Sequence, residues 1–142
     1  MIKNENNKSV ILIIEDDEQH RGFLCEFLSL SGFDVIAARN GKEGIRLYKN
    51  YRSDLVLTDI VMPEMDGFEV VQTILSLDTG MPIIAMSGYS KCHKSSYLNM
   101  ISMLGADAVL SKPINSRKLL ETIYKTLNYK KDRKKSYIEN QP

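Results

Sequence analysis

The sequence predicts an α/β fold built on a doubly wound parallel sheet, and three observations support that prediction. Five short apolar runs rich in β-branched residues recur along the chain, and amphipathic helical segments separate them. Each intervening segment is long enough to carry the chain back across the sheet, so successive strands can run parallel. Right-handed crossovers then place helices on both faces, which gives a (βα)5 order.

The predicted strands are short, and the first and third are apolar almost throughout. A strand with both faces covered by helices has no solvent side, so a continuous apolar run is its expected pattern. That pattern is typical of a sheet that lies between two layers of helices. The predicted strands are residues 10–14, 33–37, 55–58, 82–86 and 108–111.

Capping residues and apolar stripes mark the helices between these strands. The first helix ends just before Gly32, a residue type that suits a helix C-terminus. Candidate N-caps are Asp17, Asn40, Asp66, and Asn115 or Ser116. The predicted helices cover residues 18–30, 40 to about 49, a stripe from 68 to 75, about 95–103, and 116 to about 128.

Composition describes an ordinary soluble protein and excludes several classes. The 142 residues carry 19 Lys and Arg against 18 Asp and Glu, a net charge of +1 that argues against a dedicated nucleic-acid binder. Cys25 and Cys92 are too few for a disulfide framework or a zinc site. The polar start and the short first apolar run match neither a secretory signal nor a membrane span. We therefore expect a cytoplasmic protein without membrane insertion.

One composition shift suggests where the domain ends. Residues 130–135 hold five basic side chains and one acid, so they carry +4 and leave −3 on the rest of the chain. We expect a disordered leader at 1–8, one domain at 9–129, and a basic flexible tail at 130–142. The alternative for the tail is docking to an acidic partner. We expect no separate output domain.

Polar side chains follow four of the five predicted strands. Glu15 and Asp16 follow the first, Asp59 the third, Ser87 the fourth and Lys112 the fifth. In doubly wound sheets, ligands bind beyond the carboxyl ends of the strands. Carboxylates brought together there need a cation to stay ionised, and hard oxygen ligands with open positions favour Mg²⁺. The sequence therefore predicts a magnesium site.

A metal beside one aspartate, with a hydroxyl and a lysine opposite, is the arrangement of a phosphoryl-transfer site. Asp59 would be the nucleophile, since a carboxylate needs no base to activate it. Lys112 would neutralise charge on the phosphoryl oxygens, and Ser87 would donate a hydrogen bond to them.

Four motifs strengthen this interpretation: ILIIEDD at 11–17, DLVLTDIVMPEMDG at 54–67, MSG at 86–88 and GADAVLSKP at 105–113. With these motifs, the chain resembles the receiver domain of bacterial two-component response regulators. The likeness spans nearly the whole globular chain, from residue 10 to about 128. It implies the chemotaxis-regulator type of flavodoxin-like fold, with strand order 2-1-3-4-5.

The resemblance also implies residue roles. Asp16 would touch Mg²⁺ directly and Glu15 through water, and the main-chain carbonyl of Val61 would be a further ligand. Asp59 would be the phosphorylated aspartate and Ser87 the switch hydroxyl. Lys112 would be the family's lysine, often followed by a cis peptide bond, here to Pro113.

The partners implied are a sensor histidine kinase or a histidine phosphotransfer protein as donor, and an unknown downstream protein. The chain would not be an enzyme, although it would catalyse its own Mg²⁺-dependent phosphorylation and dephosphorylation. It departs from the family at Val109, where an aromatic ring is usual. His20 and His93 are predicted to be solvated surface residues, since neither has a second ligand at metal spacing.

Three other functions remain as alternatives. An aspartate-nucleophile phosphohydrolase needs a second acid two residues after the nucleophile, and Val61 stands there. A nucleotide or flavin binder needs a Gly-rich turn after the first strand, which the sequence lacks. An interaction-only receiver is disfavoured because the acidic, hydroxyl and lysine positions are all filled.

Overall fold

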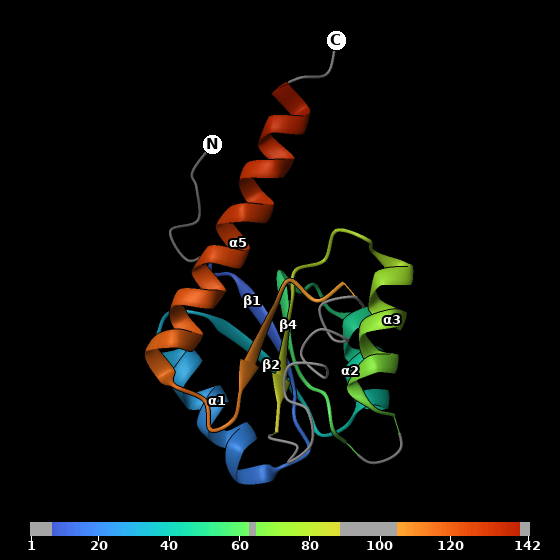
Figure 1. Ribbon diagram of the computed structural model, residues 1–142, viewed down its shortest axis with the longest axis vertical. Coiled ribbons are helices and arrows are strands. Elements are labelled where there is room, and N and C mark those ends of the chain that lie inside the picture. The colour runs from blue at the N-terminus through green and yellow to red at the C-terminus, as the bar shows by residue number, and fades with distance from the viewer. Residues whose placement is uncertain (1–6, 63–64, 89–104, 140–142) are drawn as a thin grey trace.

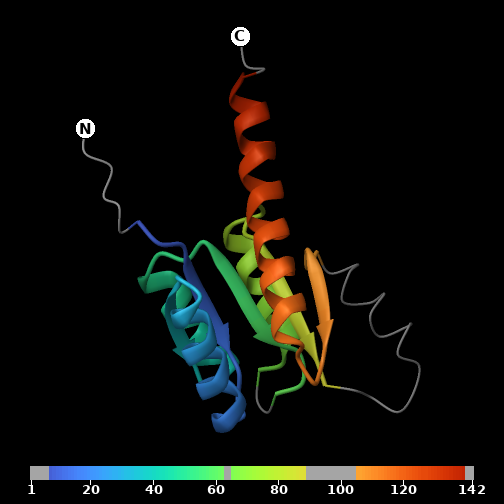
Figure 2. The ribbon, with the colours of Figure 1, turned by 90° about the vertical axis from the view of Figure 1, so that its left-hand side faces the viewer.

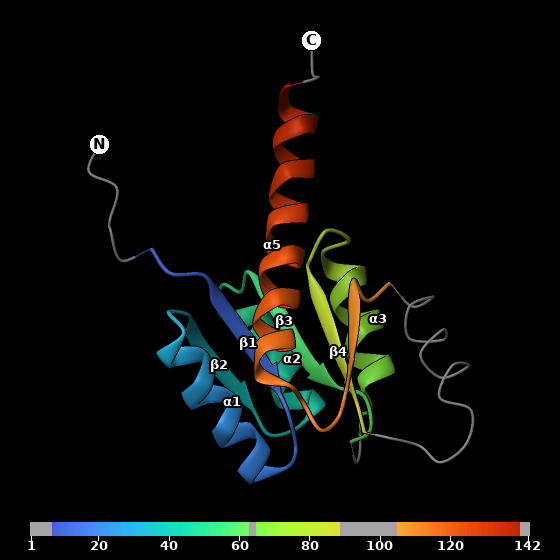
Figure 3. The same cartoon turned by 60° about the vertical axis from the view of Figure 1, so that its left-hand side comes forward.

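The computed structural model describes residues 7–62, 65–88 and 105–139, with side chains described as far as residue 128. Five parallel strands form one sheet in the order β2-β1-β3-β4-β5, as predicted (Figures 1 and 3). The strands are β1 (Val10–Ile14), β2 (Asp34–Ala38), β3 (Leu55–Asp59), β4 (Ile83–Ser87) and β5 (Ala108–Ser111). The described helices are α1 (Glu18–Leu30), α2 (Gly41–Asn50), α3 (Gly67–Leu77) and α5 (Ser116–Glu139).

Helices cover both faces of the sheet, and β1 shows why its run is apolar throughout. Ile11 and Ile13 pack in the layer under α1 and α5, whereas Leu12 and Ile14 pack under α2 and α3. Side chains alternate between the faces of a strand, so a strand covered twice needs apolar residues at every position. In Figure 1 α1 and α5 lie on one side of the sheet, and α2 and α3 lie on the other.

Hydrogen bonds at the strand ends explain small shifts from the predicted bounds. Strand β2 begins at Asp34 because the Phe33 amide instead donates to Leu28 O at the end of α1 (3.1 Å). The turn between them passes through Gly32 at φ 98°, a backbone conformation that suits glycine. Strand β3 extends one residue further than predicted and includes Asp59.

The helix caps follow the predictions where the structure describes them. The side chains of Asp17, Asn40 and Asp66 accept from the backbone amides of His20, Glu43 and Glu69. Asn115 accepts from the Lys118 amide at the start of α5 (3.1 Å). The helix predicted near 95–103 lies outside the described residues.

Helix α5 is longer than its apolar stripe predicts. Leu119 and Ile123 are buried against the sheet, and Leu127 is the last of the stripe to pack there. The helix then continues through the basic segment to Glu139 and projects beyond the sheet (Figures 1 and 2). An apolar stripe marks only the part of a helix that packs against other elements. The backbone hydrogen bonds of the helix can continue past that part. Within the described ranges, no helix is long and apolar enough to span a bilayer.

Candidate functional site

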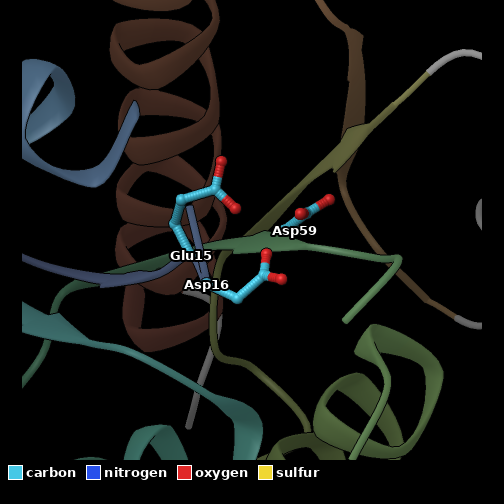
Figure 4. A group of neighbouring side chains, drawn as sticks. All are labelled: Glu15, Asp16 and Asp59. Atoms are coloured by element: carbon cyan, nitrogen blue, oxygen red, sulfur yellow. The ribbon is translucent and has the colours of Figure 1, made fainter. Parts of the chain in front are cut away.

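Three carboxylates gather at one edge of the sheet, where β1 and β3 end (Figure 4). Ile14 pairs with Thr58, so the residues that come next, Glu15 and Asp59, emerge side by side. Asp16 completes the group. One oxygen from each lies within 4.8 Å of the others, as the strand-end argument predicts.

Asp59 is held in place at the base of the site and is only 4% exposed. Its Oδ1 accepts from the Ile60 amide at 2.8 Å, and its Oδ2 accepts from Lys112 Nζ at 3.1 Å. Burial, reinforced by the Glu15 carboxylate, raises the pKa of Asp59 from 3.8 to about 6, even though Lys112 opposes the shift. The negative charge of Asp59 is therefore costly until a further cation compensates it.

Glu15 has no exposed surface at all. Its Oε1 accepts from Lys112 Nζ at 2.7 Å and is also contacted by His20 Nδ1. Its Oε2 is buried and has no hydrogen-bond partner among the described residues. A buried carboxylate oxygen without a partner among the described residues is unusual, so this oxygen has acceptor capacity that a bound cation or water could use.

Lys112 connects the two buried carboxylates. It follows β5 and lies beside β4, since its amide donates to Ser87 O at 2.9 Å. Burial disfavours its charge, but Glu15 and Asp59 outweigh burial and hold the pKa of Lys112 above its ordinary value. The peptide bond from Lys112 to Pro113 is cis.

Ser87 lies at the same edge, as the last residue of β4. It is almost completely buried, and its Oγ donates to Gly88 O at 3.4 Å. Met86 pairs with Asp59, so the hydroxyl belongs to the strand next to the buried aspartate. Val109, which stands where the family that the chain resembles usually has an aromatic ring, packs against Ile60 and Ala85.

Gly67, the first residue of α3, packs directly against the residues at the end of β3. The Gly67 amide donates to Ile60 O at 2.8 Å, and a Cβ at Gly67 would lie 2.5 Å from Ile60 Cα. Only glycine allows this approach, because any side chain would push the loop away from Asp59. The Val61 side chain, by contrast, is 62% exposed.

The prediction that His20 is simply a solvated surface residue is wrong. Its side chain is 22% exposed, and Nδ1 contacts Glu15 Oε1. His20 is the third residue after the N-cap Asp17, a position whose side chain points back toward the helix start and hence toward the end of β1. That helical position, next to an acid at a strand end, is the signal that could have identified it. His93 lies outside the described residues.

The residues present fit a hard divalent cation. The donor set is all carboxylate, Asp16 is exposed and accessible, and the orphaned Glu15 oxygen offers buried acceptor capacity. Among the described residues one ammonium group, that of Lys112, is paired with the two buried carboxylates, so added positive charge would be stabilising.

Comparisons with known proteins point to one family and one fold. A model of the response regulator receiver domain matches residues 11–124. The chemotaxis protein CheY of Bacillus subtilis is 37% identical over 119 residues, which cover 83% of this chain and 97% of that protein. The polar-differentiation response regulator DivK of Brucella anthropi is 32% identical over 115 residues, covering 80% and 91%. Among solved structures, a CheY-like receiver domain protein from Methanospirillum hungatei JF-1 aligns with a TM-score of 0.81 at 31% identity, covering 89% of this chain and 99% of that one.

Proposed function

The chain belongs to the response regulator receiver domain family, and from that premise we propose that it accepts a phosphoryl group on Asp59. The donor would be a sensor histidine kinase or a histidine phosphotransfer protein. One observation carries the proposal: Asp59 is buried at a strand end, beside Glu15 and Asp16 and in hydrogen-bond contact with Lys112. A phosphoryl group attached there would lie next to carboxylates that can hold a cation and within reach of an ammonium group.

The chemistry needs little from the protein beyond position. An oxygen of Asp59 attacks phosphorus in line with the bond to the donor imidazole nitrogen, and that bond breaks as the new P–O bond forms. The electron pair leaves with the imidazole. Lys112 Nζ lies 3.1 Å from Asp59 Oδ2, within reach of an oxygen of the transferred group. Ser87 Oγ, on the neighbouring strand, would donate to another oxygen.

Glu15, Asp16, Asp59 and the carbonyl of Val61 would hold Mg²⁺. The ion supplies positive charge that lets the carboxylates stay ionised and offsets the charge of the phosphoryl oxygens. Asp16 suits direct contact because it is exposed, whereas Glu15 is fully buried. With the ion bound, the protein would also accept phosphate from a small acyl phosphate and lose it again by hydrolysis.

The phosphorylated form would signal through a changed surface that a downstream protein recognises. Residues 9–129 would form the phosphoaccepting unit, and the basic segment from 130 onward would contribute to partner choice. Ser87 ends β4 and Lys112 follows β5, so contacts made to a phosphoryl group would shift the ends of those two strands. We place this protein in the cytoplasm, where such donors act.

The test is incubation with a small acyl phosphate and Mg²⁺, followed by intact mass measurement. We expect one added phosphoryl group on the wild type and none on Asp59→Asn. Asp16→Asn should also fail, while Asp34→Asn, an exposed acid at the far end of β2, should behave as wild type. Labelling that persists in Asp59→Asn would overturn the assignment.

A further inference from the structure

The orientation of the buried Glu15 carboxylate depends on two donors that share one of its oxygens. Oε1 accepts from Lys112 Nζ at 2.7 Å and meets His20 Nδ1, whereas Oε2 has no partner in the described part of the chain. An ionised Glu15 can only accept, and the His20 tautomer that makes this contact with it carries its hydrogen on Nδ1. The two contacts together fix the plane of a carboxylate that no solvent reaches.

We propose that His20 is a positioning residue for the metal site: its imidazole holds Glu15 by Oε1 and so keeps Oε2 available to the cation or to a water bound to it. The inference rests on the proposed function in one respect, that the acidic cluster binds Mg²⁺. Groups that hydrogen-bond a metal-site ligand from behind orient it and commonly tune metal affinity.

His20 is well fixed for this task. Its backbone amide donates to Asp17 Oδ1 at 2.9 Å in the helix cap, which sets where the residue sits on the first turn of α1. Its ring stacks on Phe23, with centroids 6.5 Å apart and planes 11° apart. The helix cap fixes the backbone of His20, and the stacking contact with Phe23 restricts its ring, so that Nδ1 stays directed at Glu15.

Lys112 alone cannot hold Glu15 throughout the reaction. Lys112 Nζ also donates to Asp59 Oδ2 at 3.1 Å. In the proposed function this ammonium group moves toward the oxygens of a phosphoryl group on Asp59. When Lys112 turns toward the phosphoryl oxygens, His20 remains as a donor to Oε1. The Glu15 carboxylate then keeps its orientation, and Oε1 keeps a hydrogen-bond partner.

The test measures the Mg²⁺ dissociation constant of the unphosphorylated protein by isothermal titration calorimetry. His20→Phe keeps an aromatic ring for the stack on Phe23 but cannot donate a hydrogen bond, and His20→Gln replaces the ring with a side chain that can donate. We expect His20→Phe and His20→Ala to weaken Mg²⁺ binding by about tenfold. His20→Gln should recover most of the loss, and Gln19→Ala, an exposed neighbour on α1, should bind as wild type.

Three outcomes would overturn the proposal, and they are distinguishable. Unchanged affinity in both His20→Phe and His20→Ala, beside normal wild-type binding, would overturn the role of His20 alone. Tighter binding in these variants would mean that His20 competes with the cation for Glu15. A wild-type protein that binds no Mg²⁺ would overturn the metal site of the proposed function as well. Using both Phe and Ala keeps the result decisive if one variant does not fold.

Discussion

Asp59→Asn should stabilise the metal-free protein at neutral pH, because it removes a charge that the fold holds at a cost. Burial and the neighbouring Glu15 raise the pKa of Asp59 from 3.8 to about 6. The folded protein therefore binds a proton at Asp59 more tightly than the unfolded chain does. The contribution of Asp59 to the free energy of unfolding is therefore most favourable at low pH, and it falls as the pH rises through about 4 to 6.

The size of the effect follows from the shift. About two pKa units correspond to at most about 3 kcal/mol of unfolding free energy. The site is open to solvent at Asp16, and screening there reduces this to about 1–2 kcal/mol. By linkage, about half of the difference between wild type and Asp59→Asn should disappear between pH 7.5 and pH 5.

Urea denaturation followed by circular dichroism, at these two pH values in a metal chelator, measures the difference directly. Saturating Mg²⁺ should remove most of the pH dependence from the wild type and do little to the variant. Equal stability of the two proteins at neutral pH would refute the reasoning. So would an advantage of the variant that grows as pH falls.

Three further predictions test the surrounding structure. Mg²⁺ at about 100 times its dissociation constant should stabilise the fold by roughly 2.7 kcal/mol in a thermal melt, and Asp16→Asn should lose most of that gain; a melt indifferent to Mg²⁺ would contradict it. Lys112→Ala should destabilise the metal-free protein by about 1–3 kcal/mol in urea denaturation, because buried Glu15 loses its ammonium partner, and it should accept little phosphate by intact mass. Gly67→Ala should lower the free energy of unfolding by about 1–3 kcal/mol in the same denaturation assay, because its Cβ would meet Ile60 at the end of β3. Gly22→Ala, whose Cβ would have nothing within 4 Å, should leave the stability unchanged or raise it. Equal effects of the two substitutions would count against the packing argument.

Much of the site could be predicted from sequence because its residues lie at the carboxyl ends of strands or within two residues after them. In a parallel sheet these ends meet at one edge, so locating the strands was enough to bring Glu15, Asp59 and Lys112 together. Small errors in strand bounds did not matter. Ser87 and Asp59 proved to be the last residues of their strands and not the first residues after them, and they lie at the same edge either way.

His20 was missed because its role depends on where a helix begins relative to a strand end. Its nearest partner, Glu15, lies on the other side of the helix cap, and no periodic pattern marks the pair. The length of α5 was missed for a related reason. The apolar stripe that predicted the helix ends at Leu127, whereas the helix continues to Glu139.

By itself the sequence determined the order of the elements, the apolar faces that pack them and the chemical types at the strand ends. These are local properties, encoded in periodicity, capping residues and the residue after each strand. Only the tertiary structure decided which carboxylates are buried, which oxygen of Glu15 is left without a partner, and how far the pKa of Asp59 rises. Those quantities depend on distances between segments far apart in the chain. Lys112 and Glu15, 97 residues apart, meet at 2.7 Å only once the sheet is assembled.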